Sequence, residues 1–166
     1  MPAQQQQPTD SASADAERTA AWDAFAEFVA VVEPRLRRGL VGWCGSDAHD
    51  ATAEALAWAW EHWDRVQDLS NPAGYLYRVA QSKSRSPKQG LLPHPGEIGL
   101  PDVEPDLVPA LVALPGKQRT AVWLVHGCGW SYAECAEAME ISASAVGTHV
   151  SRALEALRRR LEVDDA

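Results

Sequence analysis

The sequence predicts an all-α protein made of two small helical domains that are joined by a flexible linker. Apolar residues recur at helical spacing before residue 86 and after residue 105, and no stretch alternates as a strand would. Between these blocks, residues 86–105 contain eight prolines and glycines, a density that excludes a regular helix. The 166 residues are 46% apolar and 23% charged, which is typical of a globular protein.

Four segments follow from this pattern. We expect a disordered tail over residues 1–18, a helical domain over 19–86, a linker over 87–105 and a second helical domain over 106–163. The longest apolar run, residues 107–114, contains a proline and is too short to span a membrane, and the first residues lack a signal pattern. The sequence therefore predicts a cytoplasmic protein without membrane insertion.

Charge is unevenly distributed along the chain, whose formal charge is −8. Residues 41–70 carry six acidic and one basic side chain, a sum of −5, whereas residues 71–90 carry four basic side chains and no acidic one. A protein that holds DNA unaided usually has a broader basic surface. We expect nucleic acid to be held weakly by the chain alone, or with a partner that supplies more positive charge. The alternative is that this basic segment is only a solvated helix end.

The first domain contains four predicted helices. The first begins near Trp22 and breaks at Pro34, where the second begins. The third runs from about Ala48 to Trp63, with Ser46 or Asp47 as its cap and an inner stripe of three large residues. That stripe consists of Leu56, Trp60 and Trp63. The fourth helix begins at Pro72 after the cap Asn71 and runs to about Arg85.

The second domain ends in two capped helices. Ser131 and Glu134 have the spacing of a capping box, and the short helix that they open has apolar residues at Tyr132, Cys135, Ala136 and Met139. Ser142 caps the last helix, whose predicted inner stripe is Val146, Val150, Ala153, Leu154, Leu157 and Leu161. A short helix, a tight turn and a longer helix predict a helix-turn-helix that places its second helix in the major groove of DNA. The alternative is a plain helical hairpin.

The outward face of the last helix is small and polar, as close approach to base edges requires. Its candidate DNA-binding residues are Ser144, Ala145, Gly147, Thr148, His149, Ser151 and Arg152. Arg152 can reach a guanine or a phosphate. Gly147 costs about 1 kcal/mol of helix stability relative to alanine, which close approach to DNA can offset; simple tolerance of the glycine is the alternative.

Five motifs resemble the bacterial RNA polymerase sigma factors of the extracytoplasmic-function class, in the family's order and separations. They are residues 47–60, 71–80, 114–119, 131–136 and 141–153. The resemblance implies that the first domain is a region 2-like four-helix bundle and the second a region 4-like helix-turn-helix. It also implies core RNA polymerase and promoter DNA as partners, an anti-sigma factor as a further partner, and a place on the nucleoid.

The resemblance assigns three groups of residues. Those that meet the polymerase clamp are Asp47, Asp50, Glu54 and Trp58. Those at the melted minus-ten element are Asn71, Tyr75, Tyr77, Arg78, Ser82, Lys83 and Arg85. The helix residues given above read the minus-thirty-five element. Either tyrosine can stack on a base, with core packing as the alternative for each.

The family usually has larger or polar residues where Ala51, Ala53 and Trp58 stand, and basic residues near Gly147 and His149. The departures at Ala51, Ala53, Gly147 and His149 leave open a sigma-like protein that binds polymerase or an anti-sigma factor without initiating transcription. A free-standing helix-turn-helix regulator that binds operators as a dimer is a separate alternative, which explains residues 106–161 but gives the first domain no purpose.

No catalytic, metal or cofactor site is predicted. His126, Cys128 and Cys135 do not have the spacing of a closed zinc site, and no phosphate-binding loop or nucleophile–base pair stands out. Together with Cys44 these cysteines are expected to be buried thiols rather than disulfides. We therefore expect a protein that is not an enzyme and needs no cofactor.

Overall fold

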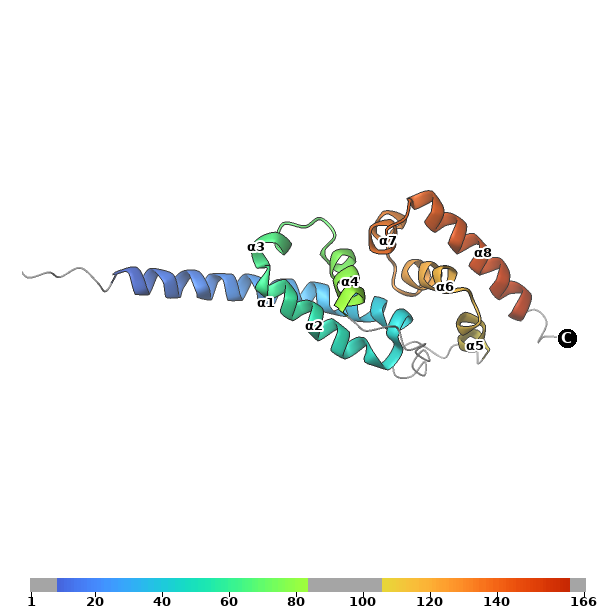
Figure 1. The fold of residues 1–166 in the computed structure, drawn as a ribbon, viewed down its shortest axis with the longest axis horizontal. Coiled ribbons are helices and arrows are strands. Elements are labelled where there is room, and N and C mark those ends of the chain that lie inside the picture. Colours follow the sequence, from blue (N-terminus) through green and yellow to red (C-terminus); the bar gives the residue numbers. More distant parts are fainter. Residues whose placement is uncertain (1–8, 84–105, 162–166) are drawn as a thin grey trace, which may run out of the picture.

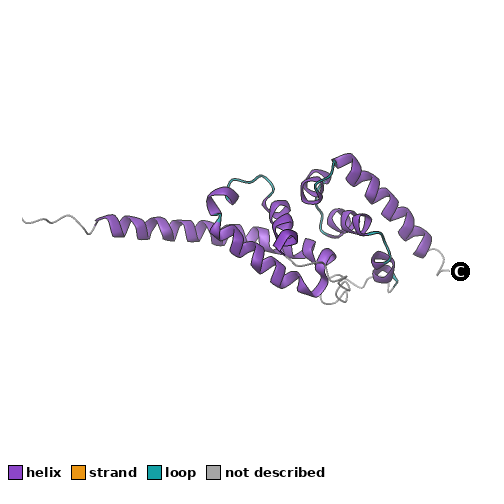
Figure 2. Ribbon diagram, viewed as in Figure 1, coloured by secondary structure: helices purple, strands orange, loops and turns teal. Residues whose placement is uncertain are grey.

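The structure is a computed structural model that describes residues 9–83 and 106–161. All secondary structure in these two ranges is helical, which confirms the predicted fold class (Figures 1 and 2). The predicted linker and the end of the basic segment, including Arg85, lie outside the described residues. No helix in the described part of the chain has the length and apolar character needed to cross a bilayer.

The first element, α1 (Thr9–Cys44), is one helix of 36 residues rather than the predicted tail and two shorter helices. Residues 9–18, which we expected to be disordered, form its first turns and project from the bundle in Figure 1. The predicted break at Pro34 is also wrong. Proline removes one backbone N–H, but Pro34 and Ala30 are both exposed, so water can satisfy the carbonyl that loses its partner.

The helix α2 (Ala48–Glu61) follows a single 3₁₀ turn, η1 (Gly45–Asp47). Asp47 stands at the N-cap of α2, but its side chain accepts no capping hydrogen bond, contrary to expectation. The buried face of α2 is also not the predicted one. It consists of small residues, Ala48, Ala51, Thr52, Ala55 and Ala59, whereas Trp60 is 39% exposed. Small side chains let α1 and α2 approach closely, and this contact displaces the larger residues to the edge.

The remaining helices of the first unit are the short α3 (Trp63–Val66) and α4 (Pro72–Lys83). Asn71 caps α4 as predicted, since its Oδ1 accepts a hydrogen bond from the Gly74 N–H at 3.0 Å. Leu76 and Tyr77 on α4 are at most 1% exposed and pack into the core. This packing fixes which face of α4 remains outside.

The second unit contains α5 (Leu107–Val112), α6 (Gly116–Val122), the π-helical turn η3 (Trp123–Gly127), α7 (Tyr132–Met139) and α8 (Ala143–Leu161). The predicted stripe of α8 is confirmed, with Val146, Val150, Ala153 and Leu157 buried. Tyr132 of α7 is 44% exposed rather than part of the core. The two units share one continuous hydrophobic core instead of standing apart.

The seam between the units is closely fitted around the two tryptophans Trp123 and Trp130. The indole N–H of Trp123 donates to the backbone carbonyl of Arg38 on α1 at 2.9 Å, and the two units meet there at Gly42. A β-carbon at Gly42 would lie 2.2 Å from Cδ1 of Trp123. Only glycine therefore permits this approach of α1 to η3.

Candidate nucleic-acid interface

The helix-turn-helix is held by local hydrogen bonds at both helix starts. The Ser131 hydroxyl accepts from the Glu134 N–H at 3.2 Å, and Glu134 accepts in return from the Ser131 N–H at 2.8 Å. Ser142 accepts from the Ala145 N–H at 3.1 Å, so both predicted caps are confirmed. Three residues separate α7 from α8, and the first, Glu140, has a φ of +53°. This left-handed residue ends α7 and turns the chain sharply.

The outer face of α8 has the small and polar character that major-groove entry requires. Ser144, Thr148, Ser151 and Arg152 are exposed, while Val146 and Val150 point to the core from the other side. Thr148 donates to the carbonyl of Ser144 at 3.1 Å. The face is therefore open to a ligand within this fold.

Three other predicted residues of α8 are only half exposed: Ala145, Gly147 and His149. A β-carbon at Gly147 would lie 3.3 Å from the ring of Tyr132, so this glycine serves the contact between α7 and α8. Nδ1 of His149 is buried and has no hydrogen-bond partner. The sequence pattern placed these residues on the correct helix but could not separate packing positions from open ones.

The helix α4 presents only some of the predicted minus-ten residues. Tyr77 is 1% exposed. The prediction that it stacks on a base is therefore wrong, and the alternative, that it packs in the core, is confirmed. Tyr75 is half-buried; its ring lies 5.7 Å from that of Trp58, and the Arg78 guanidinium lies 5.5 Å from its centroid. Ser82 and Lys83 are exposed at the end of the helix.

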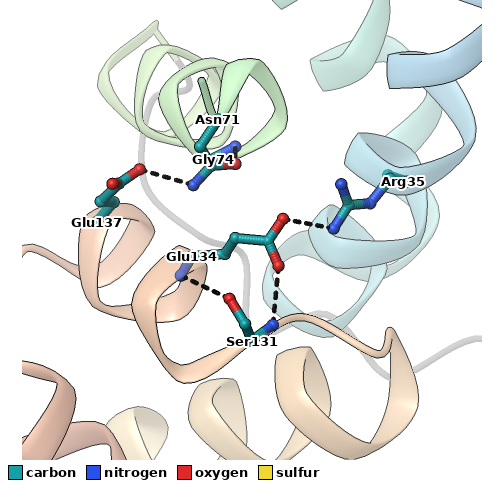
Figure 3. A network of polar contacts seen from close by, with 6 residues as sticks. All are labelled: Arg35, Asn71, Gly74, Ser131, Glu134 and Glu137. Atoms are coloured by element: carbon teal, nitrogen blue, oxygen red, sulfur yellow. Dashed lines mark hydrogen bonds and ion pairs between the residues drawn. The ribbon is translucent and has the colours of Figure 1, made fainter. Parts of the chain in front are cut away.

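Asn71 and Arg78 both reach the second unit. Asn71, which is 8% exposed, donates from Nδ2 to Glu137 at 2.8 Å, and Arg78 lies 3.3 Å from Glu140 (Figure 3 shows the first contact). A third contact joins Arg35 of α1 to Glu134 at 2.8 Å. The structure thus pairs two predicted minus-ten residues with carboxylates of α7.

The predicted polymerase-binding residues lie on or next to α2. Asp47, Asp50 and Glu54 are exposed and form an acidic surface around the start of the helix. Trp58 is half-buried and stacks on His62, with ring centroids 4.1 Å apart. It belongs partly to the packing between α2 and α4 and is not freely exposed.

The end of α2 contributes to an exposed aromatic pair that the sequence pattern did not assign to a site. Trp22 of α1 is 57% exposed and meets Trp60 of α2 edge-on, with ring centroids 5.3 Å apart. The two rings line a groove of about 680 Å³ between the first half of α1 and the end of α2. The alanine stripe of α2 was the signal that could have placed Trp60 outside.

The thiols are poorly reactive, because Cys44 and Cys135 are buried and Cys128 is half-buried. Burial raises the pKa of Cys44 to about 11 and the pKa of Cys128 and Cys135 to about 12. In the described ranges, no three histidine, cysteine, aspartate or glutamate side chains gather in a way that could hold a metal ion.

We expect Ellman's reagent to label the native chain at pH 8 about a hundred-fold more slowly than the urea-unfolded chain, because only the thiolate attacks. The pKa of each thiol is higher in the folded state than in the unfolded state, where it is about 8.5. Their contribution to stability is therefore complete below about pH 8.5 and is lost as the pH rises toward the folded pKa values. Rapid labelling of all three native thiols at pH 8 would contradict this assignment.

The chain was compared with known proteins. Residues 107–157 match the family "Sigma-70, region 4". No curated protein matches the sequence at a significant level. The fold is similar to that of the sigma factor RpoE from Bartonella quintana, solved in complex with the anti-sigma factor NepR, at a TM-score of 0.66 and 24% identity. That alignment covers 84% of this chain and 98% of the other.

A second similar structure is CnrH, solved in complex with the cytosolic domain of CnrY. Its TM-score is 0.63 at 20% identity, and the alignment covers 89% of this chain and 97% of the other. The family match therefore supports the predicted resemblance over residues 107–157, and the two solved structures show that the whole described chain shares their fold.

Proposed function

We propose that this chain is a sigma factor that binds core RNA polymerase and directs promoter recognition and the start of transcription; its region 4 match and its fold support this. One observation carries the proposal: the segment that matches region 4 presents an open, small and polar face on the second helix of a fully capped helix-turn-helix. The chain supplies binding surfaces, and the polymerase supplies the chemistry. Its place of action is the cytoplasm, at the nucleoid.

The proposed minus-thirty-five surface is the exposed face of α8. Ser144, Thr148 and Ser151 leave room for the helix to approach base edges, and Arg152 provides the long donor that can reach a guanine. Arg158, Arg159 and Arg160 follow in the last turn and suit phosphate contacts. The first part of α8 is thus proposed to contact bases, and its last turn is proposed to contact phosphates.

The proposed minus-ten surface is the open edge of α4. Tyr75 offers a half-exposed ring for a base, and Arg78 and Lys83 offer charge for phosphates of the unpaired strand. Asn71 and Tyr77 do not belong to this surface in the present arrangement, because both are buried. This reduced set is consistent with weak DNA binding by the chain alone.

The acidic surface around Asp50 and Glu54 is proposed to meet basic groups on the polymerase. Acidic residues predominate in residues 41–70, so the surface is suited to a cationic partner and repels DNA. In this proposal the acidic surface of α2 binds the polymerase, and the basic edge of α4 binds the nucleic acid. An anti-sigma factor is proposed as a third partner, as RpoE and NepR were solved together.

Run-off transcription with purified core polymerase tests the function. Genomic fragments serve as templates, and promoter-specific transcripts that require the chain are the expected result. A sigma-like protein that does not initiate would co-elute with polymerase without giving transcripts. A free-standing regulator would instead shift duplex DNA without polymerase.

Substituting Arg152 with alanine is expected to weaken promoter binding of the holoenzyme by about 1–3 kcal/mol, because a bidentate contact to one base is lost. Arg159→Ala is the matched control, since both side chains are exposed cations of α8. The control should weaken binding equally on all sequences and mainly change the salt dependence. Equal, sequence-independent effects of both variants, measured by filter binding, would refute a base contact at Arg152.

A further inference from the structure

The groove between the first half of α1 and the end of α2 is lined by two exposed tryptophans. The rings of Trp22 and Trp60 meet at an interplanar angle of 84°, so they form two nearly perpendicular surfaces. Its volume of about 680 Å³ lies within the range of ligand sites, which is about 300–1,000 Å³. We call this feature the Trp22 groove.

Buried aromatic side chains support the rings of the Trp22 groove from behind. The centroid of Phe25, which is 9% exposed, lies 4.9 Å from that of Trp60. Phe25 and Phe28 also meet Trp63 edge-on, at centroid distances of 5.3 and 5.2 Å. Side chains that are already ordered lose less conformational entropy when a partner binds. The exposed rings are therefore held ready for a contact.

The charge around the Trp22 groove is negative. Asp15, Glu61 and Asp64 line it together with Arg18. Arg18 pairs with Asp15 on the same helix, so these two charges cancel. Glu61 and Asp64 are exposed, and neither has a basic partner among the described residues. The two uncompensated carboxylates suit a cation.

The end of α2 favours a cation for a second reason. Trp60 and Glu61 are the last two residues of this helix, and its last turn contains no basic side chain. The free carbonyl groups of a helix C-terminus carry partial negative charge. Arginine suits this setting best, because its planar guanidinium stacks on an aromatic ring and also pairs with a carboxylate.

The first half of α1 offers further contact area next to the Trp22 groove. Residues 12–20 are all exposed and belong to the part of α1 that projects from the bundle in Figure 1. Short helical segments without tertiary contacts are only marginally stable, so a partner that lies along these turns would stabilise them. Residues 12–27 carry four acidic and one basic side chain, so a second copy of this helix would be repelled. Phosphates of nucleic acids or lipids would be repelled as well.

We propose that the Trp22 groove is a docking site for a basic segment of a partner protein, which inserts an arginine beside Trp22 and lies along residues 12–20 of α1. The site uses none of the residues assigned above to DNA or to the polymerase. It therefore does not depend on the proposed function, and a failure of the transcription experiment would leave it standing.

Nuclear magnetic resonance of the ¹⁵N-labelled full chain tests docking with a synthetic probe. The probe is an alanine-based helical peptide with arginine at every fourth position, and its matched control has citrulline, which keeps the shape but removes the charge. We expect saturable shifts of the Trp22 and Trp60 indole N–H signals, assigned with Trp22→Phe and Trp60→Phe. The citrulline peptide should bind about ten-fold more weakly. No saturable shift, or equal affinity for both peptides, would overturn the proposal.

The double variant Glu61→Gln/Asp64→Asn is expected to bind the arginine peptide about ten-fold more weakly, because it keeps side-chain volume but removes both charges. Asp23→Asn/Glu27→Gln is the matched control, since it makes the same charge change at exposed positions of α1 that do not line the groove. An equal loss in both double variants would mean that only overall charge attracts the peptide, and the proposed site would be wrong.

Trp22→Ala tests the aromatic half of the site and should remove detectable binding. Trp22 is 57% exposed, so the core stays intact, which a native circular dichroism spectrum verifies. Val31→Ala is the control, because it shortens another exposed apolar side chain of α1 and should bind as the wild type does. Unchanged binding by a folded Trp22→Ala variant would contradict the proposal.

Two other occupants would give different results. Spermidine that shifts the same indole signals and displaces the peptide at equal or lower concentration would assign the groove to a small polyamine. Indole shifts that depend on chain concentration without any peptide would assign it to a second copy of the chain. Either result would overturn the docking of a partner segment.

Discussion

Changing both Asp50 and Glu54 to lysine is expected to abolish binding to core polymerase, with a loss of at least about 100-fold in affinity. The two carboxylates lie four residues apart on the exposed side of α2, so one basic surface of a partner can meet both. The double change replaces two attractive contacts with two repulsive ones. Lost or reversed charge pairs at an interface cost about 2–5 kcal/mol when they are desolvated.

Co-elution with core polymerase in gel filtration, followed by a titration of labelled chain, measures this effect. Asp23→Lys/Glu27→Lys is the matched control, because it makes the same two charge changes at exposed positions four residues apart on α1. Exposed substitutions of this kind change stability by only about 0.5 kcal/mol, so the thermal melting of all variants should be similar. Unchanged polymerase affinity of the double variant would refute the assignment of α2 as the contact.

Helix boundaries set by local chemistry could be predicted from the sequence. The caps Asn71, Ser131 and Ser142 each use a side-chain oxygen to accept an N–H three residues later, which requires no information about distant parts of the chain. The stripe of α8 could be predicted for the same reason, since its period is set within one helix. The region 4 helix-turn-helix was therefore the most predictable part of the candidate site.

Helix faces and breaks that depend on neighbouring elements could not be predicted in this way. The predicted buried face of α2 was the one with the largest side chains. In the structure the close contact with α1 buries alanines instead and leaves Trp60 at the surface. The predicted break at Pro34 was wrong because the surrounding turn is exposed, so water can replace the backbone hydrogen bond that proline cannot donate. Both outcomes are decided by packing rather than by local preference.

The contacts between carboxylates of α7 and the first unit were beyond sequence reasoning for a different reason. Asn71 and Glu137 are 66 residues apart, and Arg35 and Glu134 are 99 residues apart. Charged residues on a helix surface are usually solvated, and no local pattern distinguishes a solvated carboxylate from one that meets another unit. The same limit explains why Asn71 and Tyr77 were assigned to DNA although the structure buries them.

Substituting Gly42 with alanine is expected to separate the two units. The new β-carbon would lie 2.2 Å from Cδ1 of Trp123, so the indole ring must move. That ring is 6% exposed, and its N–H donates to the Arg38 carbonyl, so a shift also breaks a buried hydrogen bond. Overpacking of this kind costs about 1–3 kcal/mol, which corresponds to a roughly five- to 150-fold change in the equilibrium between packed and separated units.

Gly116→Ala separates this effect from the intrinsic preference of alanine for helices. No atom lies within 4 Å of a β-carbon at Gly116, so alanine there should leave the two units packed together and stabilise α6 slightly. Alanine at Gly42 also favours α1 by about 1 kcal/mol, which means that any opening must come from the contact with Trp123. In small-angle X-ray scattering, a larger radius of gyration for Gly42→Ala but not for Gly116→Ala would show that the contact between α1 and η3 holds the two units together. Identical scattering curves for both variants and the wild type would show instead that the Trp123 ring shifts while the two units stay packed together.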